Sequence, residues 1–464
     1  MNAIIFSALA GVVMMFSGIF TKNTSIITNV ARLALVVLIA VNLLDTYGGW
    51  MIAVDTKNLL SFNKFGFFFN TILFVATFLF FVLSGRDIEK VGSYTAEYYA
   101  LIFFSLCGIA VLTSFNNLLM MFLGVEIMSI PLYILTGADK KNLKSNEASL
   151  KYFLMGSFST GIMLMGITLV YGATGNFNLP PISSSVTGAV VSDSIIGPLG
   201  LLLIFVSLCF KVSAAPFHFW TPDVYDGSPS VFTSFMATII KVAGFFAFIK
   251  LFEERSSDLR VSWKIIMPVI IVATLLAGNI TAVFQQSVKR MLAYSSIAQA
   301  GFMLFAVYAN NNSIGKEGIL LYAAAYSLAT IGIFAILIRM KDYTFNGYNG
   351  LAKKEPFIAA VNTIFLLSLA GIPLTAGFFA KYYMLAAAVN AGGKSVLWLV
   401  IIAVLFAAVS VYYYFRVIQA MYFKDGDAEV ENVNNRFKFG LFVLAALIII
   451  IGILPSVLLN WLYF

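Results

Sequence analysis

Four ionisable residues, one glutamate and three lysines, lie within apolar stretches of this sequence, and side chains of these two types can accept and release protons. Glu126 stands within LLMMFLGVEIMSIPLY, and Lys211, Lys241 and Lys381 lie within three other apolar stretches. Burying an ion costs free energy unless other groups compensate it. Ionisable groups in such segments are therefore rare, and they commonly line paths for ions or protons. We expect a shared function for the four, with a static ion pair as the alternative for any single one.

Lysine and glutamate together provide a way to load and release a proton. Burial disfavours the charged form of a lysine, whereas a nearby carboxylate favours it. A contact between the two charges at about 4 Å contributes about 4 kcal/mol at an effective dielectric constant of about 20. Moving one charge across a potential of about 100 mV requires about 2.3 kcal/mol. Making and breaking such a contact could therefore drive proton transfer.

Two interruptions by proline accompany these charges. The stretch Phe210–Pro229 reads FKVSAAPFHFWTPDVYDGSP, and it holds Pro216 and the only histidine, His218. A second interruption, GIPLTAG, covers Gly371–Gly377. A broken helix leaves backbone groups that need water or polar partners, so water could reach nearby lysines. His218 is either a proton relay or a packed, hydrogen-bonded histidine, and the sequence does not separate these readings.

The composition predicts a polytopic membrane protein. The 464 residues are 61% hydrophobic and 11% charged, with a mean hydropathy of +0.93, whereas soluble domains carry about 25% charged residues. The sequence has no long polar block, so it leaves no room for a soluble catalytic domain. Two cysteines in apolar stretches do not form an iron–sulfur or zinc motif. No dinucleotide or phosphate-loop motif is visible, and the scattered cations fit the positive-inside rule better than nucleic-acid binding.

Hydropathy predicts an all-α fold of about fourteen transmembrane segments. The first segment has no cation before Lys22, so we interpret it as an uncleaved helix and not a signal peptide. The expected segments are 3–20, 26–44, 62–83, 97–114, 118–136, 149–171, 197–215, 230–251, 263–284, 290–309, 315–339, 356–391, 395–423 and 437–459. The segment 356–391 is too long for one straight crossing, and Pro373 lies inside it. Lys151 falls near the start of the sixth segment, and its role is ambiguous.

The two broken segments, the seventh and the twelfth, indicate an internal repeat. Each is the fourth member of a set of five segments, and sets of five face opposite ways across the membrane. We therefore predict an N-terminal three-helix part (1–96), a first five-helix repeat (97–251), a second, inverted repeat (252–423) and a C-terminal helix (424–464). Loop lysines and arginines are about twice as frequent on one side, which predicts that both termini face the periplasm or exterior.

These motifs resemble the antiporter-type proton-channel subunits of respiratory complex I, over nearly the whole chain. Glu126 lies in a region similar to the family's helix-five motif, and Lys211 with PFHFW is similar to its helix-seven motif. Lys241 and Lys381 match the family's lysines in helices eight and twelve, and Lys151 falls where it has a helix-six lysine. The sequence TPDVYDGSP resembles the subunit N branch in particular. In KRMLAYSSIAQAGFML, Gln299 stands where relatives often have histidine.

The resemblance implies a proton-translocating subunit of a bacterial NADH:quinone oxidoreductase in the cell inner membrane. It implies that Glu126 gates Lys211, that Lys241 is the central relay, and that Lys381 faces the exit or a neighbouring subunit. This chain would hold no cofactor, with NAD, FMN, iron–sulfur clusters and quinone in partner subunits. Its partners would be neighbouring antiporter-like and quinone-proximal membrane subunits and the lipid bilayer. The alternatives are a subunit of an Mrp-type sodium/proton antiporter or of a membrane-bound hydrogenase, and a static scaffold.

Overall fold

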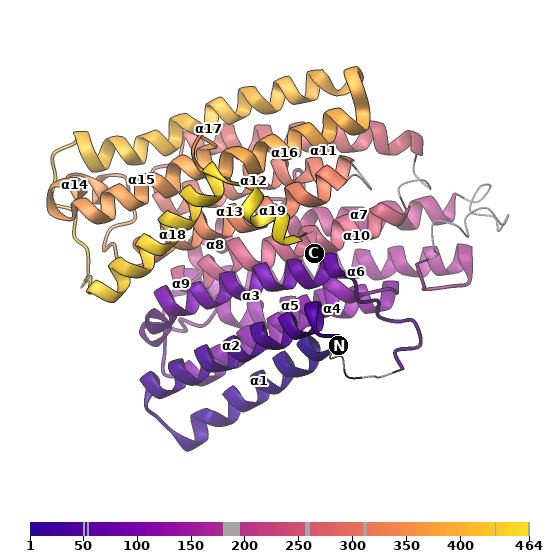
Figure 1. Cartoon of the computed structure of the whole chain (residues 1–464), viewed down its shortest axis with the longest axis horizontal. Helices are drawn as coiled ribbons and strands as arrows, with labels where there is room; N and C mark the ends of the chain where they lie inside the picture. Colours follow the sequence, from indigo (N-terminus) through magenta and orange to yellow (C-terminus); the bar gives the residue numbers. More distant parts are fainter. Residues whose placement is uncertain are drawn as a thin grey trace.

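The computed structural model describes residues 1–49, 52, 55–179, 195–255, 260–309, 313–431 and 433–462. In these ranges the chain is a bundle of long helices that run side by side (Figure 1). The helices are α1 (Asn2–Phe20), α2 (Thr24–Tyr47), α3 (Lys64–Ser84), α4 (Thr95–Ser114), α5 (Leu118–Thr136), α6 (Leu143–Thr174), α7 (Ile196–Val212), α8 (Trp220–Gly227), α9 (Ser230–Phe235), α10 (Lys241–Arg255), α11 (Arg260–Val283), α12 (Val288–Ala309), α13 (Ser313–Leu337), α14 (Leu351–Lys354), α15 (Pro356–Ala370), α16 (Ala376–Gly392), α17 (Leu397–Phe423), α18 (Asn435–Ile453) and α19 (Ser456–Leu462).

Twelve spans within the described ranges are long and apolar enough to cross a membrane. The chain is therefore an all-helical, polytopic membrane protein. Two further apolar helices, α7 and α15, are shorter than the others because each ends at an interruption. The expected segment 356–391 is accordingly two helices, α15 and α16, and the expected segment 197–215 ends as a helix at Val212.

Asparagine side chains set the start of several helices. The side-chain oxygen of Asn117 accepts from the backbone N–H of Leu119 at 2.8 Å, and that of Asn142 accepts from Lys144 at 3.0 Å. Such caps satisfy backbone donors that a helix leaves free in its first turn. The cap at Asn142 starts α6 six residues before the apolar segment expected from residue 149, since the first turns of α6 are polar.

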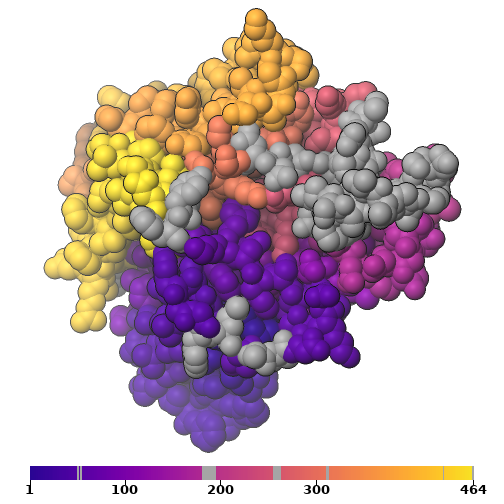
Figure 2. Space-filling model, turned by 45° about the vertical axis from the view of Figure 1, so that its right-hand side comes forward, coloured from indigo at the N-terminus to yellow at the C-terminus, as the bar shows by residue number. Residues whose placement is uncertain are grey.

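The helices differ in how deeply they lie in the bundle. The apolar windows of α13 and of the α9–α10 span are entirely buried, whereas only 28% of the α1 window is buried. The apolar window in the span of α16 and α17 is only 22% buried, and α17 lies at the edge of the molecule (Figures 1 and 2). The site lysine Lys241 opens α10 and therefore belongs to the buried centre, while α1 and α17 form the rim.

Candidate ion-translocation site

The first interruption lies directly after Lys211. Helix α7 ends at Val212 because Ser213 adopts a left-handed conformation, with φ of 64°. The N–H of Ser213 donates to the carbonyl of Phe210 at 3.1 Å, and the N–H of Ala214 donates to that of Cys209 at 2.8 Å. This pattern satisfies carbonyls that a helix end leaves free. Lys211 is thereby fixed in the last turn of a helix that stops inside the bundle.

The second interruption repeats this geometry. Helix α15 ends at Ala370, and Gly371 has φ of 84°. The N–H groups of Gly371 and Ile372 donate to the carbonyl of Leu367 at 3.0 and 3.1 Å. The ammonium of Lys381, from α16, folds back and donates to the carbonyls of Leu369 and Ala370 at 2.9 and 2.8 Å. A cation is favourable at a helix C-terminus, where carbonyl dipoles converge.

The ammonium of Lys211 contacts hydroxyl groups of α5. It donates to Ser129 Oγ at 3.1 Å and to Tyr133 Oη at 3.4 Å. Glu126 lies on α5 one turn before Ser129, and its buried Oε1 atom makes no hydrogen bond within the described part of the chain. The ion pairs found among the described residues do not include one between Glu126 and Lys211. Glu126 is thus close to the contacts of Lys211 along the helix, and the two form no direct ion pair within the described part of the chain.

Lys241 is 2% exposed and follows a π-helical turn, Met236–Ile240. Its ammonium donates to Ser296 Oγ at 2.8 Å and to the Ser296 carbonyl at 3.0 Å, both on α12. A π-helical turn breaks the regular hydrogen-bond ladder and frequently marks a functional position. The hydroxyl of Tyr326 donates to the carbonyl of Ala237 in that turn at 2.9 Å. Polar groups of α12 and α13 therefore converge on the start of α10.

Helix α12 also connects Lys241 to Lys381. Ser296, Gln299 and Phe302 follow at intervals of three residues, so they share one side of α12. Ser296 holds Lys241, and the ammonium of Lys381 lies 4.7 Å from the ring centroid of Phe302. Gln299 donates to the Leu369 carbonyl at 2.9 Å, the same carbonyl that Lys381 uses. The structure thus joins Lys241 and Lys381 through one helix face.

A series of aromatic rings, which we call the aromatic stack, fills the region between Lys211 and Lys241; only the rings of Tyr152 and Trp220 lie face to face, and its other contacts are T-shaped. The ring of Tyr152 lies 4.7 Å from that of Tyr133 and 4.7 Å from that of Trp220. The rings of Trp220 and Tyr225 are 6.0 Å apart, and the ammonium of Lys241 lies 5.8 Å from the Tyr225 ring centroid. Lys211 reaches the other end of the stack through the Tyr133 hydroxyl. The connection between these two lysines is therefore aromatic, unlike the polar connection along α12.

The remaining two sequence candidates, Lys151 and His218, form no hydrogen bond with the buried lysines among the described residues. Lys151 is 41% exposed and pairs with Glu147 and with Asp223, at 2.7 and 3.1 Å; Asp223 also pairs with Arg290 at 2.9 Å. This network fastens α6 and α12 to α8. His218 is half-buried, its ring lies 4.6 Å from that of Phe219, and its buried Nδ1 atom has no hydrogen-bond partner within the described ranges.

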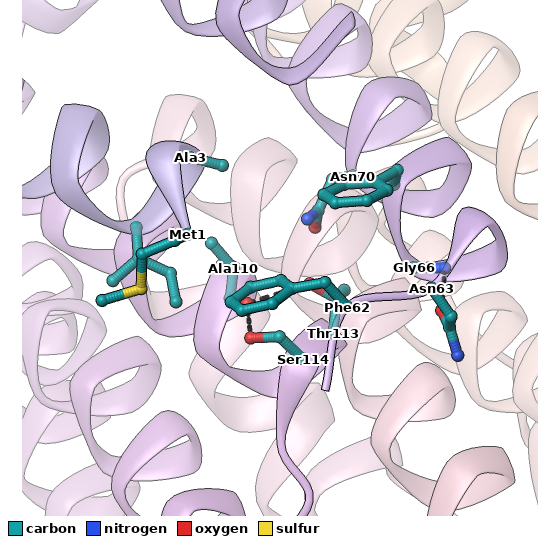
Figure 3. A pocket seen from close by; sticks show the side chains of 11 residues that line it. Met1, Ala3, Phe62, Asn63, Gly66, Asn70, Ala110, Thr113 and Ser114 are labelled. Atoms are coloured by element: carbon teal, nitrogen blue, oxygen red, sulfur yellow. Dashed lines mark hydrogen bonds between the residues drawn. The ribbon is translucent and has the colours of Figure 1, made fainter. Parts of the chain in front are cut away.

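Sequence reasoning missed Lys289, which it assigned to a loop. This lysine is 5% exposed and donates to the carbonyls of Asp226 and Ser228, at 2.8 and 2.7 Å, where α8 ends. It borders a polar hollow of about 590 Å³ that also includes Asp87, Lys144 and Asp342. Lys289 lies directly before the apolar segment expected from residue 290, so hydropathy counts it as part of a loop, whereas in the structure it lies in the first turn of α12. A different, small cavity between α1, α3 and α4 contains none of the candidate residues (Figure 3).

Long apolar helices with lysines at two interruptions define an antiporter-like class of ion-translocating membrane proteins. Comparison with known proteins agrees with this class. The family model described as the transmembrane region of NADH:quinone oxidoreductase and Mrp antiporters matches residues 115–410.

Individual relatives make the family assignment of this chain more specific. A protein of Cytophaga hutchinsonii named NADH-quinone oxidoreductase subunit N is 39% identical over 99% of both chains. A protein of the same name from Trichlorobacter lovleyi is 40% identical over 89% of this chain and 86% of its own. A chain of respiratory complex I from Thermus thermophilus, solved with aureothin, superposes with a TM-score of 0.84 and 29% identity, covering 99% of this chain and 98% of its own. The chain belongs to the NADH-quinone oxidoreductase subunit N family.

Proposed function

We propose that this chain translocates protons as a membrane subunit of a bacterial NADH:quinone oxidoreductase. One observation carries the proposal: Lys211, Lys241 and Lys381 donate to hydroxyls or helix-end carbonyls, and among the described residues no carboxylate forms an ion pair with any of them. A lysine held by neutral acceptors can give up its proton without leaving an unpaired carboxylate behind. Such sites favour exchange of a proton over a permanent ion pair.

The proposed path begins at Glu126 and ends at Lys381. Glu126 pairs with Lys211 in one state and releases it in another, and its unpartnered Oε1 atom supports that role. Lys211 passes a proton to Lys241, which passes it along α12 to Lys381. Lys381 then delivers it to the exit or to a neighbouring antiporter-like subunit. His218 serves as a relay from the interruption after α7, and Lys151 supports the path electrostatically through Asp223.

We further propose fourteen transmembrane elements arranged as two inverted five-helix repeats. The twelve spans treat α16 and α17 as one and leave out the shorter helices α7 and α15. If α15 and α16 form one broken crossing and α17 another, that single span becomes two crossings. With α7 as a further crossing, the total is fourteen. Matching helix crossings support the repeat. A Cβ atom on Gly108 of α4 would lie 2.4 Å from the Met128 nitrogen of α5, and one on Gly278 of α11 would lie 2.4 Å from the Ala298 nitrogen of α12. The proposed parts remain 1–96, 97–251, 252–423 and 424–464.

The proposed orientation places both termini on the periplasmic or exterior side of the membrane. Both chain ends lie where α3 begins, since Met1 and Phe67 line one cavity and the ring of Trp461 lies 5.0 Å from that of Phe68. Ion pairs on the opposite face join loops that the sequence assigns to the inside, such as Lys90 with Glu431 at 2.6 Å. The polar hollow beside Lys289 also opens among these loops. We propose that protons enter through it from the cytoplasm.

Under this proposal the redox chemistry takes place elsewhere. The subunit carries no redox centre, and NAD, FMN, iron–sulfur clusters and quinone bind to partner subunits. The other membrane subunits of the complex are its partners, including antiporter-like and quinone-proximal subunits. Electrostatic coupling through them would set the charge state of Glu126 and start each cycle.

The test is Lys211→Met in otherwise intact membranes, with Lys353→Met as a matched control. Lys353 is a 74% exposed lysine that pairs with Asp425. After assembly is checked, NADH-driven proton uptake and quinone reduction are followed together. We expect both rates to fall in Lys211→Met and neither in Lys353→Met. If NADH oxidation persists while sodium-dependent proton exchange disappears, the chain acts as a sodium/proton antiporter subunit and the proposal is wrong.

A further inference from the structure

An apolar groove lies within the membrane-spanning part of the bundle. It has a volume of about 170 Å³, and α3, α13, α18 and α19 form its walls (Figure 1). Along α3 it extends from Thr71 to Leu79, which corresponds to about 12 Å of helix. One leaflet of a bilayer contributes about 15 Å of hydrocarbon, half of the total of about 30 Å. The groove is therefore nearly as long as one leaflet is deep.

Small side chains keep the groove open. Ala76 of α3 and Ala324 of α13 line it, and they are 4% and 9% exposed. Their neighbour Val75 also lines it and is 39% exposed, so the groove opens toward the surroundings beside Val75. It is thus a recess between two helices with an opening along α3.

The walls offer little to a polar occupant. Thr71 lines the groove, but its hydroxyl donates to the Phe67 carbonyl at 3.0 Å and accepts from the Asn42 amide at 2.8 Å. Ser327 adds one further hydroxyl to the lining. A bound water molecule needs two to four polar partners, so these walls disfavour water. An empty groove would lose dispersion contacts on its open side. An apolar occupant therefore suits the walls best.

The dimensions separate the two apolar occupants that a membrane offers, a helix and a lipid tail. A volume of about 170 Å³ spread over about 12 Å gives a cross-section of about 14 Å². A helix with a diameter of about 10–12 Å occupies about 80–110 Å². The groove is too narrow for a helix, whereas an extended hydrocarbon chain is the slimmer occupant and fits it.

One end of the groove lies where a lipid headgroup would lie. Trp461 of α19 lines the groove, and its ring lies 5.0 Å from that of Phe68, one turn before Thr71. Tryptophan is enriched at the depth of the headgroups. The opposite end, at Leu79 and Leu328, lies well inside α3 and α13. The groove therefore runs from the interface toward the middle of the membrane, as an acyl chain does.

We propose that this groove binds one acyl chain of a phospholipid, with its headgroup beside Trp461 in the leaflet where α3 begins. The chain packs between α3 and α13 and fills the space between them. On α13, Ala324 lies two residues from both Tyr322 and Tyr326, which is the opposite side of a helix with 3.6 residues per turn. The lipid thus supports α13 from behind, while the Tyr326 hydroxyl on the other side donates to the Ala237 carbonyl.

The experiment uses two phosphatidylethanolamine probes with a photoreactive diazirine on one acyl chain. One probe carries the diazirine at the end of the chain, and the other carries it beside the ester. The assembled complex is reconstituted with each probe, irradiated, and the labelled residues are located by mass spectrometry. We expect the first probe to label the chain near Leu79 and Leu328, and the second to label it near Trp461.

Matched variants test whether the groove holds the lipid. Ala324→Leu fills the groove and should abolish labelling of α3 and α13 by the chain-end probe. Ala408→Leu changes an exposed alanine of α17 in the same way and should leave that labelling unchanged. Val75→Trp provides a second variant should Ala324→Leu fail to assemble, because it covers the groove from its exposed rim.

Two results would overturn the inference. Equal labelling of α3 and α13 in the groove variants and in Ala408→Leu would show only the general lipid around the protein. Crosslinks from α3 or α13 to another subunit, in place of lipid, would assign the groove to a protein partner. Neither readout depends on proton translocation, so the lipid site and the proposed function are tested separately.

Discussion

Replacing Lys381 by methionine should separate stability from translocation. Lys381 is 7% exposed, so its charge is buried, and methionine has a similar length without the charge. Replacing a buried ion pair by apolar residues of similar volume is often neutral or stabilising by about 1–4 kcal/mol, and we take this as the upper bound for one buried ammonium. The desolvation cost of the ammonium disappears with the ammonium itself.

The cost of the substitution comes from the end of α15. The carbonyl of Ala370 loses the donor that lies 2.8 Å away, whereas the carbonyl of Leu369 keeps the donor from Gln299 at 2.9 Å. An unsatisfied buried carbonyl costs about 1–3 kcal/mol. The gain and the loss therefore offset each other to within about 3 kcal/mol. Lys381→Met should assemble and unfold at nearly the temperature of the unmodified protein.

Translocation by Lys381→Met should be lost all the same, because the proposed proton acceptor of the second repeat is missing. The assay combines thermal unfolding of the purified complex with proton uptake by inverted vesicles during NADH oxidation. A stable variant with normal uptake would refute the reasoning, since Lys381 would then be dispensable. A variant that fails to assemble would refute the stability argument alone.

Two further predictions concern packing and the loop 424–434. Gly278→Val should destabilise the protein by about 3 kcal/mol or more, because its side chain would collide with the α12 backbone; Gly161→Val, with no atom within 4 Å, is the control, and equal thermal unfolding would contradict this. Hydrogen bonds and charge from Lys90 lower the pKa of Glu431, and Lys353 does the same for Asp425. A carboxyl group whose pKa is lowered by folding stabilises the loop fully at a pH above its ordinary pKa of about 4. This stabilisation is lost as the pH falls through the lower pKa of the folded state. A spin label at Lys424→Cys should therefore gain mobility in acid, and constant mobility would contradict the ion-pair account.

The sequence predicted which residues are buried ions better than it predicted their partners. Apolar neighbours on both sides placed Lys241 and Lys381 within transmembrane segments, where ionisable groups rarely face lipid. Hydropathy could not show that Ser296 and Leu369 would hold them, since those contacts depend on how α12 packs against α10 and α15. Lys289 was missed for a related reason: helix ends look like loops when their carbonyl partners belong to another element.

The ends of the helices could likewise be predicted only approximately from the sequence. The sequence placed the interruptions near Pro216 and Pro373, whereas α7 and α15 end at Val212 and Ala370, each directly before a residue with a left-handed backbone. Lys151 shows the limit of reasoning from segments. It lies in a spanning helix, yet the face it occupies turns toward Asp223 and solvent. Only the packing of α6 against α8 determines that face.

The most direct measurement is the number of protons moved per NADH oxidised by a complex that carries Lys241→Met. Lys241 is 2% exposed and contacts both α12 and the aromatic stack, so every proposed route through this subunit includes it. We predict a complex that assembles and moves fewer protons per NADH, or none. An unchanged ratio at an unchanged rate of NADH oxidation would contradict proton transfer through the buried lysines.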